Sequence, residues 1–364
     1  MLTAEAIKQQ ARELGFDLCG IAAADHFQEL ELFSEWLDRG FAGDMSYLSR
    51  SADARASIRG FLPSARSVIV VAAAYAAANE SLSSGAALAR IARYARGEDY
   101  HDVLATRLEA LVAWLRATQD APFDAAIFAD KGPVQERAYA QRAGLGWIGK
   151  NTCLIDPTLG SWLLLGGIAT SLELDADAQV EDLCGSCTLC LDACPTGALV
   201  DERQLDATKC ISYLTIETRA SIPEPLRAFI GDHAWGCDVC QDVCPYNLAP
   251  LDATLQPLAA RPDRIAPSAA DLWQRSDREL RDFVDGSAMT YRSLARLRRN
   301  LAVVIGNSRD EHAAAALDRA GHGLRHAAQS ADTPLVREHV AWAKARLAAP
   351  VELSTRMHDA PPGC

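Results

Sequence analysis

The sequence predicts three consecutive units: an α/β domain over residues 1–175, a small domain organised by cysteines over 176–250, and an all-helical domain over 251–350. Three observations predict this division. The first unit alternates helical and strand-like apolar patterns, the second holds eight of the 11 cysteines, and the third is rich in Ala, Leu and Arg without strand patterns. With 364 residues, 49% of them hydrophobic, the chain is long enough to bury such cores.

The charge and the N-terminus restrict the class of protein. A net charge of −12 disfavours a protein that coats nucleic acid over its whole surface, but it leaves room for a local basic patch. The N-terminus lacks the basic and apolar regions of a signal peptide, and no apolar stretch reaches the roughly 20 residues of a membrane helix. We therefore expect a cytoplasmic protein without a membrane partner, in which dense cysteines serve metal or redox chemistry.

The elements of the first unit follow from hydrophobic periodicity. Helical spacing predicts helices over Thr3–Leu14 and Tyr100–Ala117. Apolar runs of strand length predict strands over Phe16–Ala23, Ser67–Tyr75 and Ala125–Asp130. A further hairpin or strand pair is expected from Cys153–Asp156 and Ser161–Thr170.

Cysteine spacing in the second unit indicates iron–sulfur clusters. One run reads Cys184-x2-Cys187-x2-Cys190-x3-Cys194-Pro195, the spacing of bacterial ferredoxins, in which the cysteine before proline binds the other cluster. The run Cys237-x2-Cys240-x3-Cys244-Pro245 is one cysteine short, and Cys210 between the runs supplies it. The spacing predicts two [4Fe-4S] clusters, one bound by Cys184, Cys187, Cys190 and Cys244 and the other by Cys194, Cys210, Cys237 and Cys240. Zinc is the alternative, although a triple spacing that ends in Cys-Pro fits a cube better.

Three cysteines lie outside these sets. Cys19 lies in an apolar strand and Cys153 begins one, so both are expected in the core. Cys364 lies on a tail, residues 351–364, that is expected to be disordered.

The helical unit contains a short internal repeat. The eight residues that begin at Leu297 align with those that begin at Val336, an offset of 39 residues that is close to the period of helix-pair repeats. Coincidence in an Ala- and Arg-rich chain is the alternative.

Two stretches imitate known motifs. Residues 144–151 resemble a Walker A loop, but Asn151 stands where Ser or Thr is needed, and a helix-like stretch precedes the loop instead of a strand. Asp99-Tyr-His101 opens like the corrinoid motif Asp-x-His-x-x-Gly, but Leu104 stands where glycine is needed. His101 is therefore expected to be an ordinary residue at a helix start.

A set of longer stretches is more specific than any single motif. The stretches are 93–101 (RYARGEDYH), 130–137 (DKGPVQER), 142–152 (RAGLGWIGKNT), 160–162 (GSW), the two cysteine runs and 210–217 (CISYLTIE). With these residues the chain resembles the epoxyqueuosine reductase family over nearly its whole length.

The resemblance implies a cobalamin-binding α/β catalytic domain, a ferredoxin-like domain with two [4Fe-4S] clusters, and C-terminal HEAT-like repeats. Members of the family reduce epoxyqueuosine to queuosine at the wobble position of tRNA, the last step of queuosine biosynthesis. The implied substrate is tRNA with a GUN anticodon, for the Asp, Asn, His and Tyr acceptors. A low-potential electron donor such as flavodoxin or ferredoxin is expected, and so is a monomer.

The resemblance also implies functional residues. Asp130 is the implied proton donor, placed where active sites of α/β sheets gather, provided that burial raises its pKa; a strand-end cap is the alternative. Lys131 stands where the family commonly has a small residue, and an ammonium there would favour the carboxylate. The implied cobalamin contacts are Arg55, Tyr94, Asp130, Trp147, Lys150, Ser161 and Ser212.

A basic stretch in the helical unit is a candidate tRNA contact. Residues 286–300 contain four arginines and no acid: Arg292, Arg296, Arg298 and Arg299. Such a patch suits the phosphates of an anticodon stem-loop, and a solvated helix face is the alternative.

Three other functions fit parts of the sequence. A reductive dehalogenase also combines a corrinoid with two clusters, but it is usually exported behind a twin-Arg signal, which this N-terminus lacks. A two-cluster electron-transfer protein would not need the Asp130 stretch, and a helical-repeat interaction module explains only the last hundred residues.

Overall fold

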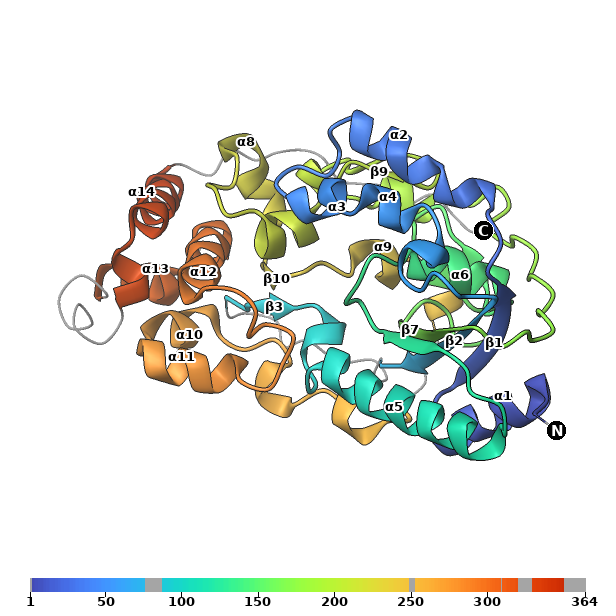
Figure 1. Ribbon diagram of the computed structural model, residues 1–364. Coiled ribbons are helices and arrows are strands. Elements are labelled where there is room, and N and C mark those ends of the chain that lie inside the picture. Colours follow the sequence, from blue (N-terminus) through green and yellow to red (C-terminus); the bar gives the residue numbers. More distant parts are fainter. Residues whose placement is uncertain (1, 76–86, 249–252, 309, 320–328, 350–364) are drawn as a thin grey trace.

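The fold places a sheet with its helices at one end of the molecule and the C-terminal helices at the other (Figure 1). The computed structural model describes residues 2–75, 87–248, 253–308, 310–319 and 329–349. The predicted tail at 351–364 lies outside these residues. Within them, no helix is long and apolar enough to cross a lipid bilayer.

The first unit is built on a four-stranded sheet. Its strands, in spatial order, are β1 (Leu18–Ala23), β2 (Ser67–Ala74), β7 (Leu163–Thr170) and β4 (Ala125–Phe128). Every neighbouring pair is antiparallel. The predicted strands are therefore confirmed, but the sheet is not the parallel one that an α/β domain implies.

The central strand β2 is buried on both faces, which explains its uninterrupted apolar sequence. Ile69 and Val71 face the core under α1 (Ala4–Glu13) and α5 (Tyr100–Thr118). Val68 and Val70 face the opposite core under α6 (Glu136–Arg142). The sheet thus carries a helical layer on each face.

Helix caps explain where the two longest helices of this unit begin. The hydroxyl of Thr3 accepts a hydrogen bond from the backbone N–H of Ala6 at the start of α1. The carboxylate of Asp99 accepts one from the backbone N–H of His101 at the start of α5. Both helices match their predicted ranges to within one residue, and three shorter helices precede β2: α2 (Leu32–Asp38), α3 (Ser46–Arg50) and α4 (Ala52–Arg55).

The expected pairing of 153–156 with 161–170 is largely wrong. β6 (Leu154–Ile155) pairs with β5 (Trp147–Ile148), whereas β7 joins the central sheet between β2 and β4. A single bridge between Asp156 and Gly160 links the two segments. The eight residues of β7 are enough to pair along β2 and pack into the core of the central sheet, whereas the two residues of β6 are not.

The cysteine-rich segment has little regular structure. Its elements are α7 (Leu189–Asp192), β8 (Leu199–Asp201), β9 (Gln204–Leu205), a π-helical turn (Tyr213–Glu217), α8 (Glu224–Arg227), β10 (His233–Trp235) and α9 (Val239–Asp242). α7 packs against α9, so corresponding parts of the two cysteine runs lie together. β10 pairs with β3 (Arg90–Ile91) of the first unit, which joins the two units.

The C-terminal unit is helical, as predicted. Its helices are α10 (Ala269–Gln274), α11 (Asp277–Val284), α12 (Leu294–Ser308), α13 (Glu311–Arg319) and α14 (Pro334–Ala348). The two copies of the short repeat lie on α12 and α14, which pack directly together. Gly306 permits this contact, because a Cβ there would lie 2.8 Å from the Cα of Ala343. The HEAT-like classification stays a prediction.

Two arginines of the predicted tRNA patch are internal, which contradicts that part of the prediction. Arg298 and Arg299 are 0% exposed. The Arg298 guanidinium donates to the carbonyl oxygen of Trp273 at 2.6 Å. Arg299 donates to the carbonyl oxygens of Leu214, Thr218 and Ala220 at 2.6, 3.1 and 2.8 Å. Since carbonyl oxygens already surround both guanidinium groups, neither is available to a phosphate.

We expect the Arg299→Met variant to lose about 3–5 kcal/mol of unfolding free energy, because methionine fills the space but leaves three carbonyls, two of them on buried residues, without this donor. Urea unfolding of the intact protein measures this loss. Arg278→Met is the matched control, since Arg278 is exposed on α11 and its replacement should cost no more than about 0.5 kcal/mol. Equal losses in the two variants would contradict a structural role for Arg299.

Candidate active site and cluster-binding cysteines

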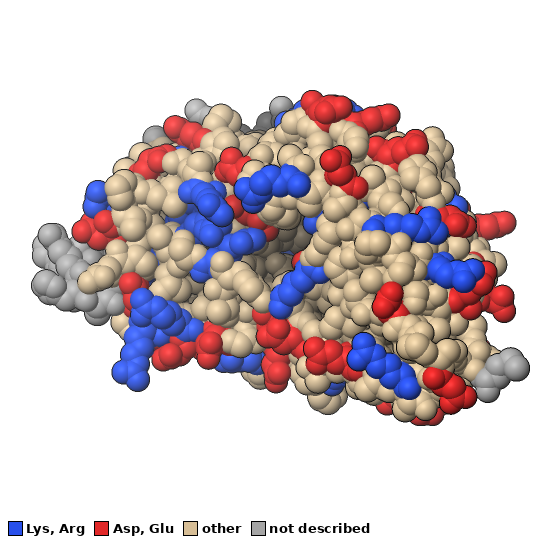
Figure 2. Space-filling model, viewed as in Figure 1, with Lys and Arg blue, Asp and Glu red and all other residues tan. Residues whose placement is uncertain are grey.

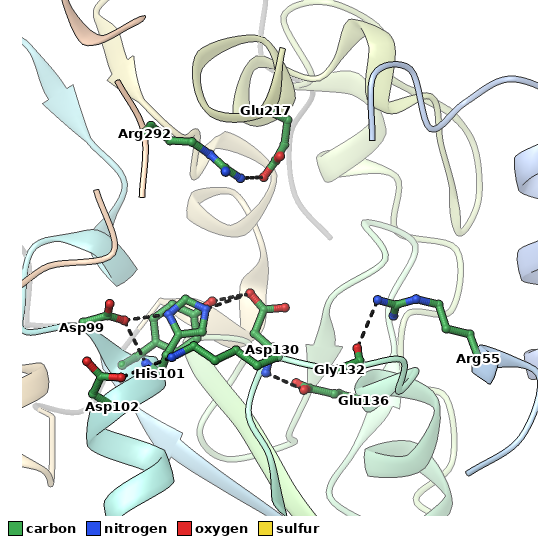
Figure 3. Close-up of polar contacts among 11 residues, drawn as sticks. Arg55, Asp99, His101, Asp102, Asp130, Gly132, Glu136, Glu217 and Arg292 are labelled. Atoms are coloured by element: carbon green, nitrogen blue, oxygen red, sulfur yellow. Dashed lines mark hydrogen bonds and ion pairs between the residues drawn. The ribbon is translucent and has the colours of Figure 1, made fainter. Parts of the chain in front are cut away.

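Asp130 lies two residues beyond the end of β4, in a backbone conformation that is unusual for a residue with a side chain. Its φ is 54°, in the left-handed region. Its Oδ2 accepts a hydrogen bond from the Tyr100 hydroxyl at 2.5 Å and lies 3.4 Å from Nε2 of His101 (Figure 3). The first turn of α5 thus supplies two polar partners to one carboxylate oxygen.

His101 connects Asp130 to a second carboxylate. Its Nδ1 lies 2.6 Å from Oδ1 of Asp99, and its ring stacks on Tyr100 with 4.0 Å between centroids. Burial alone lowers the pKa of His101, but hydrogen bonds and charges from Asp130 and Asp99 outweigh burial and raise the pKa to about 9. At neutral pH the imidazole is therefore protonated between two carboxylates.

The pKa of Asp130 is lowered, contrary to the expectation that burial raises it. Burial does favour the neutral acid, but hydrogen bonds from His101 and Tyr100, with the charges of His101 and Arg137, outweigh it. The side chain is nevertheless 65% exposed. Solvent therefore reaches this carboxylate. The face of the molecule drawn in Figure 2 is hollowed near its middle.

The Arg292–Glu217 ion pair lies across from Asp130 (Figure 3). Arg292 donates to Oε1 of Glu217 at 2.7 Å. Burial raises the pKa of Tyr47, and the negative charges of Glu217 and Asp130 raise it further. Asp130, Glu217 and Arg292 come from the first unit, the cysteine-rich segment and the helical unit, so all three units contribute to this part of the molecule (Figure 3).

The loop after Asp130 is fastened from several sides. The backbone N–H of Asp130 donates to Oε1 of Glu136 at 2.6 Å, and Arg55 donates to the carbonyl oxygens of Gly132 and Val134 at 3.1 and 3.2 Å. Lys131 donates to Oδ1 of Asp102 at 3.2 Å. The Lys131 ammonium therefore has its own carboxylate partner.

The seven expected cobalamin contacts fall into two groups. Arg55, Tyr94 and Ser212 are partly exposed, and Asp130 is mostly exposed. Trp147, Lys150 and Ser161 are at most 5% exposed and have protein partners, so their side chains are not available as direct contacts. The Lys150 ammonium pairs with Glu202 at 2.7 Å, and the Ser161 hydroxyl accepts hydrogen bonds from Gln241 and Asn247 at 3.0 and 2.9 Å. These contacts join the first unit to the cysteine-rich segment.

The thiols of the eight cysteines interact in two sets. Burial raises the pKa of Cys190 to about 11, with further contributions from the charges of Cys184 and Cys244. Burial raises the pKa of Cys237 to about 12, with contributions from Cys210 and Cys194. Each of these two thiols is thus affected by members of its own predicted set, and the two ligand sets stay a prediction. Among the described residues, no three His, Cys, Asp or Glu side chains converge on a single ion position.

Cys153 is not an isolated core residue. Its thiol lies in a hydrogen bond with Cys240, and that bond is the largest contribution raising the pKa of Cys240. The other extra cysteine, Cys19, packs against the main core, and burial raises its pKa to about 12. Sequence position alone gives no signal for the contact between Cys153 and Cys240, because 86 residues separate the two.

The remaining arginines of the predicted patch are partly occupied. Arg296 donates to the carbonyl oxygens of Ile216 and Glu217 at 3.1 and 3.3 Å. Arg219, outside the predicted stretch, is exposed, and its charge lowers the pKa of Arg296 after burial and Arg292. Sequence reasoning missed Arg219 because the turn after Glu217 brings it to α12 from a distant segment.

Tyr100, His101 and Glu136 were also missed as site residues. The sequence signal for Tyr100 and His101 is the family-like stretch 93–101, in which residues 99–101 match only the start of a corrinoid motif. In the structure, His101 of this stretch faces the Asp130 carboxylate.

Comparisons with known proteins identify the family. A family model described as a 4Fe-4S double cluster binding domain matches residues 183–247, and one described as epoxyqueuosine reductase QueG, DUF1730, matches residues 55–131. Curated epoxyqueuosine reductases from Gloeobacter violaceus and Xanthomonas campestris are 42% and 38% identical to the chain. The first match covers 86% of this chain and 99% of the relative, and the second covers 93% and 95%.

Solved structures give the same result. A crystal structure of epoxyqueuosine reductase with an epoxyqueuosine-modified tRNA stem loop aligns with a TM-score of 0.83 and 30% identity, over 95% of this chain and 90% of the other. A structure of the Bacillus subtilis enzyme, whose catalytic loop is swung out of its active site, aligns with a TM-score of 0.84, 30% identity and the same coverage. These relatives decide between the predicted reductase and its alternatives: the chain belongs to the epoxyqueuosine reductase family of oxidoreductases.

Proposed function

We propose that the protein reduces epoxyqueuosine to queuosine at the wobble position of tRNA with a GUN anticodon, using cobalamin and two [4Fe-4S] clusters. The observation that carries the proposal is the accessible Asp130 carboxylate, bonded to Tyr100 and facing His101, with Glu217 of the cysteine-rich segment across from it (Figure 3). A low-potential donor such as flavodoxin or ferredoxin would supply electrons.

We expect the following residues to hold the cofactors. Arg55, Tyr94 and Ser212 would contact cobalamin, and Cys184, Cys187, Cys190 and Cys244 would bind one cluster, with Cys194, Cys210, Cys237 and Cys240 on the other. When bound, these groups supply the two electrons that, with two protons, convert the epoxide to an alkene and water. The chain itself must place the epoxide and deliver the protons.

Proton delivery falls to Asp130 and His101 together. Because the pKa of Asp130 is lowered and that of His101 is raised to about 9, the mobile proton rests on the imidazole at neutral pH. As negative charge develops on the leaving oxygen, Asp130 takes a proton from Nε2 of His101, 3.4 Å away, and passes it to that oxygen. Asp99 holds the imidazole in this orientation through its contact with Nδ1.

Substrate RNA would be bound by a smaller basic surface than the sequence suggests. Arg219 is exposed, whereas Arg292 and Arg296 are partly exposed beside it, and all three lie at the junction of α12 with the turn Tyr213–Glu217. Phosphates docked there would lie next to the Arg292–Glu217 pair, which faces Asp130. An RNA backbone bound at this surface would thus bring the reacting nucleoside toward Asp130.

The Asp130→Asn variant should lose at least about 100-fold in turnover, because the amide preserves the shape but neither releases nor regains the proton. Conversion of epoxyqueuosine in modified tRNA measures the effect. Cluster absorbance and cobalamin binding should remain as in the unaltered protein. Turnover close to normal would exclude Asp130 as the proton donor.

The pH dependence of stability tests the raised pKa of His101. A raised pKa stabilises the fold fully below the ordinary value near 6.5, and this stabilisation is lost as the pH rises through about 9. The His101→Gln variant should therefore be about 1–2 kcal/mol less stable than the unaltered protein at pH 6, with the difference shrinking by pH 10. Urea unfolding gives both values, and exposed His312 provides the control substitution. A difference that does not change with pH would contradict the imidazolium between two carboxylates.

Salt-dependent tRNA binding tests the basic surface. Arg219→Gln should weaken binding and reduce the slope of log affinity against log salt by about 1, since one phosphate contact is lost. Arg116→Gln is the control, because Arg116 is exposed about 24 Å along α5 from its start at the active site. If both variants bind with unchanged slope, the surface around Arg219 is not the RNA contact.

A further inference from the structure

Trp147 donates a hydrogen bond to a cysteine sulfur across the boundary between two units. Its indole Nε1 lies 3.3 Å from Sγ of Cys184, although Trp147 belongs to β5 of the first unit. The ring is 2% exposed and packs edge-on against Tyr246, with 4.9 Å between centroids. Cys244 belongs to the same small apolar cluster. The N–H therefore belongs to a buried ring and points at a half-buried thiol of one proposed ligand set.

A donor at this position changes the energetics of a bound cluster. Reduction adds a negative charge that the thiolate sulfurs share, and an N–H aimed at one of them stabilises the reduced form more than the oxidised form. Low local polarity strengthens the effect. The indole N–H cannot lose a proton near neutral pH, so its contribution does not depend on titration.

The tryptophan has no evident alternative reason to point its nitrogen there. Packing against Tyr246 and Ile155 requires only an aromatic ring, which phenylalanine also provides. By comparison, Trp273 is buried in α10 with no hydrogen-bond partner for its indole nitrogen among the described residues. This protein thus tolerates a buried indole without a partner, and the bond to Cys184 is a specific feature of Trp147.

We propose that Trp147 is a positioning residue that acts through Cys184 to raise the reduction potential of the cluster bound by Cys184, Cys187, Cys190 and Cys244. This inference rests on the ligand set in the proposed function. It assigns Trp147 to electron transfer instead of the direct cobalamin contact expected from the sequence.

The test is a redox titration of the two clusters, followed by electron paramagnetic resonance, in the anaerobically purified full-length protein. Trp147→Phe keeps an aromatic ring but removes the N–H. We expect the equilibrium constant for one-electron reduction of the first cluster to fall about tenfold, or about 59 mV, while the second cluster keeps its potential. Trp273→Phe is the matched control and should change neither potential.

Unchanged potentials in Trp147→Phe with both clusters present would overturn the proposal. If that variant loses its clusters, replacing Trp147 with benzothienylalanine keeps the bicyclic shape without the N–H, and the same potential shift is required of it. Cys184→Ser separates this inference from the one it rests on, because an unaltered first-cluster signal in that variant would disprove the ligand set itself. If Trp147→Phe loses turnover while both cluster potentials stay unshifted, the redox role of Trp147 is disproved but the proposed function is not.

Discussion

The structure depends on a buried polar seam along α12. Arg299 and Asn300 are both 0% exposed and bond to backbone carbonyls of the segment that follows Cys210. Asn300 also donates to the carbonyl oxygen of Ala234 at 2.9 Å, just before Cys237. Burial disfavours the charge of Arg299 and lowers its pKa to about 9, so the carbonyl bonds must compensate for lost hydration. The helical unit thereby fixes the backbone on which two proposed cluster ligands lie.

A second junction fixes the cysteine-rich segment from the other side. The amide groups of Gln241 and Asn247 donate to the Ser161 hydroxyl, and Lys150 pairs with Glu202. Between these junctions the segment needs little regular structure of its own. Asp130 on the first unit and Glu217 on the segment are consequently held across from each other (Figure 3).

Local patterns predicted the elements well and their assembly less well. Strand β2 and helix α5 follow from apolar periodicity, and the double-cluster domain follows from cysteine spacing, both of which are local properties. Strand direction does not, because a buried apolar strand reads the same in parallel and antiparallel sheets. The burial of Arg298 and Arg299 was not predictable for a similar reason. A charged residue is expected to be exposed unless the groups that surround it are known. Here those groups are backbone carbonyls of residues 214–220 and 273–275, which are distant in the sequence. The lowered pKa of Asp130 likewise depends on its contact with His101, 29 positions away in the sequence.

The exchange of cysteines between the two runs has a consequence for synthesis of the chain. With the ligand sets proposed here, the first cluster needs Cys244 and the second needs Cys240, so neither can be completed until nearly the whole segment has left the ribosome. α12 follows more than 40 residues later, and its Arg299 and Asn300 then bond to the segment that holds Cys210. With these proposed sets, cluster insertion is a late event that couples the maturation of all three units.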